Sequence, residues 1–180
     1  MTPLHLAIQY WRSGNSLDNI DLLLRNGAST KITNYRGHNA LVIAIYQDKP
    51  EVVQLLIDNG AEINIKSISD MTPLELAIYH KQLECAKILI QSGADPNLTF
   101  SNKGPLYYAV DGLYTDTIKL LIEKGARANE SIIDIVKAKR ELVMNQFSKN
   151  SLGRDYYDAL GEYFTRELSR IDNIIALLKK

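Results

Sequence analysis

The side chains that most often carry chemistry are few and widely separated in this sequence. The three histidines, His5, His38 and His80, do not have the spacing of metal ligands. Cys85, the single cysteine, takes the place of Val52 in a repeat described below, at a helix position that is usually buried. We therefore expect a small core side chain there rather than a nucleophile. Without a nucleophile elbow, a phosphate loop or paired carboxylates, the sequence predicts a protein that is not an enzyme and holds no metal or cofactor.

The composition is that of a soluble globular protein with one main core. The 180 residues are 46% hydrophobic and 23% charged, which argues against disorder. Lysine plus arginine and aspartate plus glutamate both number 21, so the formal net charge is +0. Proteins that hold nucleic acid through its phosphates usually show a basic excess or stripe. We therefore expect no nucleic-acid partner.

The chain also lacks the features that direct a protein to a membrane or to an oxidising compartment. One cysteine cannot form an intramolecular disulfide, and the first residues lack the basic-then-apolar layout of a secretory signal. No apolar run approaches the roughly 20 residues that span a bilayer. We expect a monomeric, cytoplasmic protein without a membrane partner, although secretion by a route without a cleaved signal stays open.

Three sequence markers repeat in constant phase along most of the chain. The first is a Gly-Ala pair, whose glycines lie 33, 33 and 32 residues apart at Gly27, Gly60, Gly93 and Gly125. An apolar block precedes each pair, as in Leu55-Leu56-Ile57. The third marker opens each repeat: Thr2-Pro3-Leu4-His5-Leu6-Ala7, Asn39-Ala40-Leu41-Val42-Ile43-Ala44, Thr72-Pro73-Leu74-Glu75-Leu76-Ala77 and Gly104-Pro105-Leu106-Tyr107-Tyr108-Ala109. This agreement indicates four copies of one structural unit.

The first copy resembles the ankyrin repeat signature T-P-L-H-x-A in full, and the period of about 33 residues fits the same family. The resemblance covers residues 1–130, with repeats at about 1–34, 35–67, 68–100 and 101–130. It implies an all-α solenoid of stacked helix pairs, joined by projecting β-hairpin-like fingers. Local chemistry agrees, because Thr2 and Thr72 suit helix N-caps and the glycines suit left-handed C-caps.

The first repeat departs from the pattern by four extra residues within 9–17. They could add one turn to the first helix, or they could form a longer exposed loop. Trp11 lies in this insertion. Its side chain could be a binding anchor, or it could shield the end of the stack.

No ankyrin motif explains residues 131–180. Apolar residues recur there at helical spacing over 131–147 and 155–178, with a break at 150–153. We expect a long helical hairpin that docks on the fourth repeat and caps its apolar face. A dimerisation surface and a docking site for a second partner are the other interpretations.

The resemblance implies that a partner docks on the concave side, formed by the fingers and the exposed ends of the first helices. Aromatic, arginine and methionine side chains are enriched at protein interfaces. The candidate partner-binding residues are Tyr35, Arg36, His38, Tyr46, Ile68, Met71, Tyr79, His80, Phe100 and Lys103. The rings of Tyr46 and Tyr79 could equally stack between repeats and stiffen the groove.

The leading functional hypothesis is a non-enzymatic module that binds another protein through this surface. The alternative is an adaptor or a secreted pathogen effector, acting in the host cytosol, whose repeats hold one protein while the C-terminal helices recruit a second. The sequence does not name the partner in either case.

Overall fold

The computed structural model describes residues 1–67, 69–100, 102–149 and 157–179, and within these ranges the chain forms ten helices and no strand. The all-α repeat architecture is therefore confirmed. Eight short helices form four pairs: α1 (Pro3–Tyr10) and α2 (Asp18–Arg25), α3 (Ala40–Tyr46) and α4 (Pro50–Asp58), α5 (Pro73–Tyr79) and α6 (Leu83–Gln91), and α7 (Pro105–Asp111) and α8 (Thr115–Glu123). Two longer helices follow, α9 (Glu130–Lys149) and α10 (Tyr157–Leu178).

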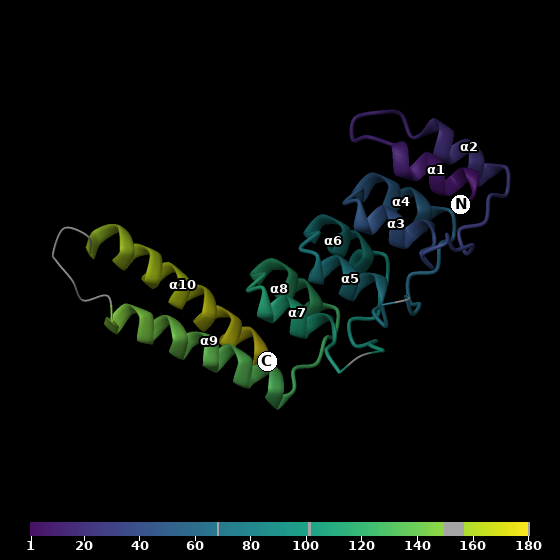
Figure 1. The fold of residues 1–180 in the computed structure, drawn as a ribbon. Helices are drawn as coiled ribbons and strands as arrows, with labels where there is room; N and C mark the ends of the chain where they lie inside the picture. Colours follow the sequence, from purple (N-terminus) through teal and green to yellow (C-terminus); the bar gives the residue numbers. More distant parts are fainter. Residues whose placement is uncertain (68, 101, 150–156, 180) are drawn as a thin grey trace. The chain divides into compact units, whose positions relative to one another are not determined.

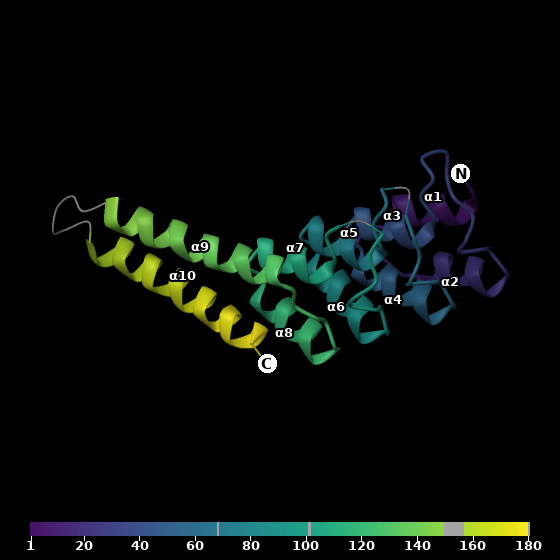
Figure 2. The same ribbon diagram turned by 90° about the horizontal axis from the view of Figure 1, so that it is seen from below.

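The chain divides into two compact units, Met1–Pro105 and Leu106–Lys180. In the first unit, α1 packs on α3 and α3 on α5, while α4 packs on α6, as Figures 1 and 2 show. The small side chains of Ala44 and Ala77 are fully buried, which allows successive first helices to approach closely. Ile45 and Leu56 are also fully buried and fill the core between the helices.

Side-chain caps start three of the first helices. Oxygens of Thr2, Asn39 and Thr72 each accept a hydrogen bond from the backbone N–H three residues later, at 3.4, 2.9 and 3.1 Å. Pro3 and Pro73 occupy the first helical position, where a missing N–H costs no hydrogen bond. The predicted caps are confirmed.

The recurring Gly-Ala pairs end the second helices. Gly27, Gly60, Gly93 and Gly125 have φ between 78° and 93°, in the left-handed region. The N–H of each following alanine then donates to a carbonyl five residues back, as from Ala61 to Leu56 at 2.9 Å. A Cβ at these glycines would meet no atom within 4 Å, so backbone conformation rather than space requires glycine.

The fingers join successive pairs within the first unit and contain turns rather than strands in the part of the chain that is described. Backbone hydrogen bonds close the first two fingers, including those from the N–H of Asn34 to the carbonyl of His38 (2.8 Å) and from the N–H of Ser67 to the carbonyl of Met71 (2.9 Å). The β-hairpin detail of the expected fingers is therefore not confirmed. Asp70 takes φ 56° at the turn of the second finger, where Gly37 (φ 74°) stands in the first.

The four extra residues of the first repeat mainly form a loop and do not add a turn to the first helix. α1 ends at Tyr10, and residues 11–17 separate it from α2. Trp11 is the C-cap residue of α1 and is only 8% exposed, so its ring packs instead of serving as an exposed anchor. Ser13 ties the loop to α4 through a hydrogen bond to Glu51 (3.2 Å).

Lys49 is a buried cation that lies beside this loop. Its Nζ donates to the carbonyls of Ile8 (2.5 Å) and Gln9 (3.3 Å), in the last turn of α1, and lies 5.8 Å from the centre of the Trp11 ring. These carbonyls lie at the end of the helix and carry the negative end of its dipole, and the carbonyl of Ile8 also accepts from the N–H of Trp11 at 3.3 Å. Burial lowers the pKa of Lys49 from its ordinary value. Lys49 therefore caps a helix of the preceding repeat.

His5 completes the cap of α1 and also reaches the first finger. Its Nδ1 accepts from the N–H of Thr2 (3.1 Å), so Nε2 carries the proton and donates to the carbonyl of Ile32 (3.0 Å). The residue is fully buried. Burial lowers the pKa of His5 below its ordinary value of 6.5, because the charged ring would lose its hydration.

We predict that acidification destabilises the protein through His5. Folding favours the neutral ring, so below about pH 6.5 the unfolded chain binds the proton more tightly. The contribution of His5 to the free energy of unfolding should have its full value above about pH 6.5 and should decrease as the pH is lowered below it. Urea unfolding followed by Trp11 fluorescence between about pH 8 and pH 5.5 measures this. In His5→Gln, which can keep both hydrogen bonds without titrating, the slope should decrease; an unchanged slope would contradict the prediction.

Glu75 takes the place of His5 in the third pair, but only one of its oxygens has a partner. Oε2 accepts from the N–H of Thr72 (2.6 Å) and completes the capping box. Oε1 is buried, and no described residue donates to it. The residue is 0% exposed, so this oxygen is an unsatisfied acceptor within the first unit.

In the second unit, α9 and α10 lie side by side as a hairpin (Figure 1), and α10 packs on α8. Ile132 and Val136 of α9 and Ile171 and Ile174 of α10 are buried. Polar contacts support the same packing, including Arg140 to Asp172 (2.8 Å), Lys139 to Asp111 (3.1 Å) and Arg170 to the carbonyl of Leu113 (2.9 Å). The fourth pair thus belongs to the same compact unit as the C-terminal helices.

Candidate functional site

The first finger presents Tyr35 and Arg36 at a turn that Asn34 holds. The side-chain oxygen of Asn34 accepts from the N–H groups of Arg36 (2.9 Å) and His38 (3.1 Å), and its carbonyl accepts from Gly37 (2.9 Å). Tyr35 is 78% exposed, and the guanidinium of Arg36 lies 5.4 Å from the centre of its ring. The finger therefore displays an aromatic side chain and a cation on an ordered turn.

Four aromatic rings form a continuous row across the second and third repeats. His38 stacks on Tyr46 with centroids 4.8 Å apart, Tyr46 meets the edge of His80 at 5.1 Å, and His80 meets Tyr79 at 5.1 Å. We call His38, Tyr46, His80 and Tyr79 the ring row. Tyr46 is 36% exposed and Tyr79 is 59% exposed, so the contacts between rings leave much of their surface open. Burial, and then the charge of Arg36, lower the pKa of His38.

A hollow of about 460 Å³ lies between the first finger and the first helices α1 and α3. We call it the finger pocket. Its lining combines a cation, aromatic rings and amides, and no carboxylate is among the residues Met1, Gln9, Asn34, Tyr35, Arg36, His38, Ile43, Tyr46 and Gln47. Four predicted binding residues, Tyr35, Arg36, His38 and Tyr46, therefore meet at one place.

The other predicted residues lie farther along the fingers. Met71 is half-buried at the end of the second finger, and Phe100 is 41% exposed on the third. Lys66 lies 5.9 Å from the centre of the Phe100 ring, which links these two fingers. Lys103 is exposed. Ile68, the remaining predicted residue, lies outside the described residues.

Asn34 is the main feature of the finger pocket that the sequence reasoning did not single out. The sequence does indicate this role, because an asparagine three residues before a turn glycine often accepts hydrogen bonds from the backbone that follows it. Gln9 was also missed as a lining residue, because its approach to the finger depends on how two repeats pack.

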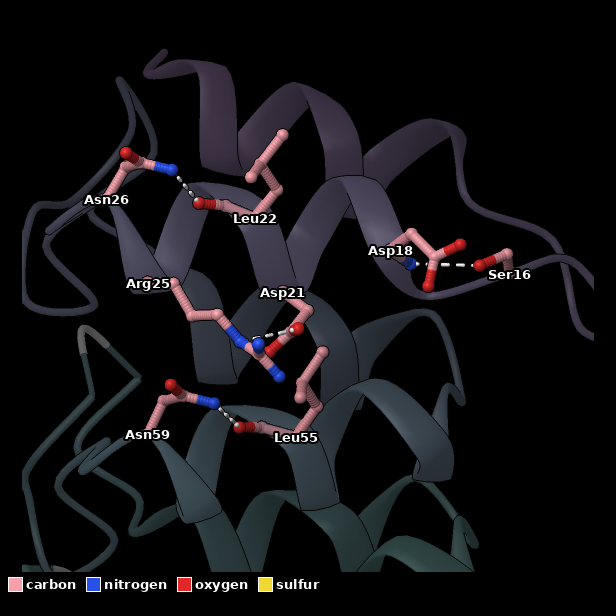
Figure 3. Close-up of polar contacts among 8 residues, drawn as sticks. All are labelled: Ser16, Asp18, Asp21, Leu22, Arg25, Asn26, Leu55 and Asn59. Atoms are coloured by element: carbon pink, nitrogen blue, oxygen red, sulfur yellow. Dashed lines mark hydrogen bonds and ion pairs between the residues drawn. The ribbon is translucent and has the colours of Figure 1, made fainter.

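The second helices present a different and polar surface. Figure 3 shows the side-chain amides of Asn26 and Asn59 donating to the carbonyls of Leu22 (2.7 Å) and Leu55 (2.9 Å) at the ends of α2 and α4. Arg25 pairs with Asp21 at 2.8 Å on the same helix. These contacts stay within single helices, so this face supplies suitable control positions.

Among the described residues, neither a metal site nor a reactive cysteine is found. Within them, no group of three histidine, cysteine or acidic side chains could hold a metal ion. Burial, with the nearby Asp48 carboxylate, raises the pKa of the Cys85 thiol to about 12, so the reactive thiolate is strongly disfavoured. The helices of the described ranges also include none that is both long and apolar enough to cross a bilayer.

Comparison with known families agrees with this structure. The family described as "Ankyrin repeats (3 copies)" matches residues 4–100 and 69–132. A search of the curated proteins found no match to the chain. The chain belongs to the ankyrin repeat family, whose members are generally protein–protein interaction modules and typically not enzymes.

Proposed function

We propose that this chain is a non-enzymatic recognition module that binds a segment of another protein on the fingers and first helices of Met1–Pro105. The single observation that carries the proposal is the ring row beside the finger pocket. Exposed aromatic rings on an ordered backbone bury much area on binding at a small cost in side-chain entropy. In this arrangement the rings also contact each other, so one set of side chains both stiffens the surface and offers it to a partner.

The test is binding by the variant Tyr46→Ala plus Tyr79→Ala. Proteins captured by the wild-type chain from cells of its source would be purified and titrated against wild type and variant. Removal of two interface rings should weaken affinity by at least about tenfold, since each such truncation often costs more than about 1 kcal/mol. The control, Leu22→Ala, removes a side chain that is 61% exposed on α2 and should leave affinity unchanged. Unchanged binding by a folded double variant would rule out this surface.

For α9 and α10, we propose that they cap the fourth repeat. Burial of Val136 and Ile174 and the packing of α10 on α8 support this role, since terminal units of repeat proteins must cover an otherwise exposed apolar face. A second role for these helices, recruitment of another partner, is supported only by the exposure of two apolar side chains on α9, Leu142 (58%) and Met144 (42%).

A further inference from the structure

Arg36 is a cation in position to bind an anion. It is exposed at the rim of the finger pocket, and its backbone N–H is held by Asn34. The Tyr35 ring lies under its guanidinium. Among the residues that the structure describes, none forms an ion pair with Arg36. The guanidinium carries five N–H donors, and the pocket that Arg36 lines contains no carboxylate.

The neighbouring finger lysines differ from Arg36 in this respect. Lys31 pairs with Glu62 across two fingers at 2.5 Å, and Lys66 pairs with Asp70 in the second finger at 2.8 Å. Their charges are already balanced by carboxylates of the same surface. Among the described residues of the first two fingers, the cation without an ion-pair partner is therefore Arg36, which lines the pocket with Tyr35 and Tyr46.

We infer that the finger pocket recognises an extended acidic segment of a partner protein, with an aspartate or glutamate of that segment paired to Arg36 and a neighbouring apolar side chain on Tyr46. A guanidinium can hold a carboxylate through two parallel hydrogen bonds, which fixes direction as well as charge. The amides of Gln9 and Gln47 line the same pocket and can bond to the backbone of the segment. This inference rests on the proposed function and specifies the chemistry of the partner.

A nucleic-acid phosphate could also pair with a guanidinium, but the surroundings of Arg36 favour a peptide. Phosphate backbones are held by several cations in a row. Here the adjacent cations are paired with acids, and the lysine and arginine total equals the aspartate and glutamate total at 21. One cation between aromatic rings matches a single carboxylate flanked by apolar side chains.

The test uses the full chain and three variants. Short random peptides displayed on phage are first selected for binding to the wild type and, separately, to Arg36→Glu. We expect peptides that bind the wild type to contain more Asp and Glu than the unselected library. Arg36→Glu should abolish this acidic excess. A labelled selected peptide, measured by fluorescence anisotropy, should bind Arg36→Gln about tenfold more weakly, with a smaller salt dependence. Arg25→Gln, the same change on the α2 face, should bind like the wild type.

The outcomes separate the inference from the proposed function. Selected peptides without an acidic excess, or an excess that survives Arg36→Glu, would overturn the inference. If such peptides still lose affinity in Tyr46→Ala plus Tyr79→Ala, the proposed function stands. Failure of the wild type to select any peptide, or binding that is insensitive to both the Arg36 and the ring variants, would overturn both. If a single-stranded oligonucleotide competes as well as the unlabelled peptide for the labelled peptide's site, the inferred acidic peptide would be wrong and a phosphate ligand would take its place.

Discussion

Replacement of Lys49 by methionine is expected to lower the free energy of unfolding by about 2–3 kcal/mol, because a buried hydrogen-bonded ammonium is lost. Methionine fills a similar volume but cannot donate to the carbonyls of Ile8 and Gln9, which Lys49 bonds at 2.5 and 3.3 Å. The C-terminal dipole of α1 and the Trp11 ring would also lose a nearby positive charge. Urea unfolding checks the loss, and Trp11, the single tryptophan, reports by fluorescence from the affected site.

Lys31→Met is the matched control for this experiment. Lys31 also makes a 2.5 Å contact, to Glu62, but the two side chains are 70% and 54% exposed. Exposed ion pairs contribute at most about 1 kcal/mol, so this variant should unfold close to the wild type. Equal losses in the two variants would show that burial does not distinguish them and that Lys49 is not a structural cap.

Glu75→His is expected to raise the free energy of unfolding by about 1–3 kcal/mol, the usual cost of a buried polar atom without a partner. The wild-type Oε1 is such an atom. A histidine can keep the capping bond to Thr72 through Nδ1, as His5 does with Thr2. By equivalence of the repeats, the acceptor expected for its Nε2–H is the carbonyl of Leu98, which lies five residues after Gly93 as Ile32 lies five after Gly27.

Two further variants make the Glu75 experiment decisive. Glu75→Gln keeps the shape and replaces the orphan oxygen with an N–H donor, so a smaller gain in stability is expected. Glu75→Ala removes the unsatisfied oxygen but also loses the capping bond, which costs about 1 kcal/mol, so its stability should lie below that of Glu75→Gln. Urea midpoints measured by circular dichroism compare the three. A loss of stability in both Glu75→His and Glu75→Gln would show that the carboxylate already has a partner, and the proposed unsatisfied site would be wrong.

Much of this fold is predictable from local sequence because ankyrin repeats depend on short-range rules. Glycine in left-handed backbone ends each second helix, and Thr2, Asn39 and Thr72 cap first helices, so a period of about 33 residues locates the helix pairs. The long apolar stripes also predict the two C-terminal helices, found at Glu130–Lys149 and Tyr157–Leu178. The expected break at 150–153 and the expected helix start at 155 lie outside the described residues. The insertion in the first repeat was ambiguous, because a helical turn and a loop both fit four residues.

The features that escaped prediction depend on contacts between repeats. From the sequence alone, Lys49 would be expected to be exposed like most lysines. The packing of the second repeat on α1 buries it against Ile8 and Gln9. The unsatisfied oxygen of Glu75 likewise depends on how the folded chain buries this side chain, which residue spacing does not show. For the candidate site, residue types placed Tyr35, Arg36, His38 and Tyr46 on one surface. The ring row and the pocket required distances that no spacing rule supplies. Their role in binding stays a prediction.

The hydrogen bonds of Asn34 have a consequence for the thermodynamics of recognition. Four backbone groups of the first finger, the N–H groups of Arg36, Gly37 and His38 and the carbonyl of His38, are already bonded to Asn34 in the free protein. A loop that becomes ordered only on binding subtracts that lost entropy from the affinity. Here the cost of ordering is met during folding, so the entropy lost on complex formation would fall mainly on the partner segment. Selection for tighter binding would then act on the partner's own flexibility more than on this finger.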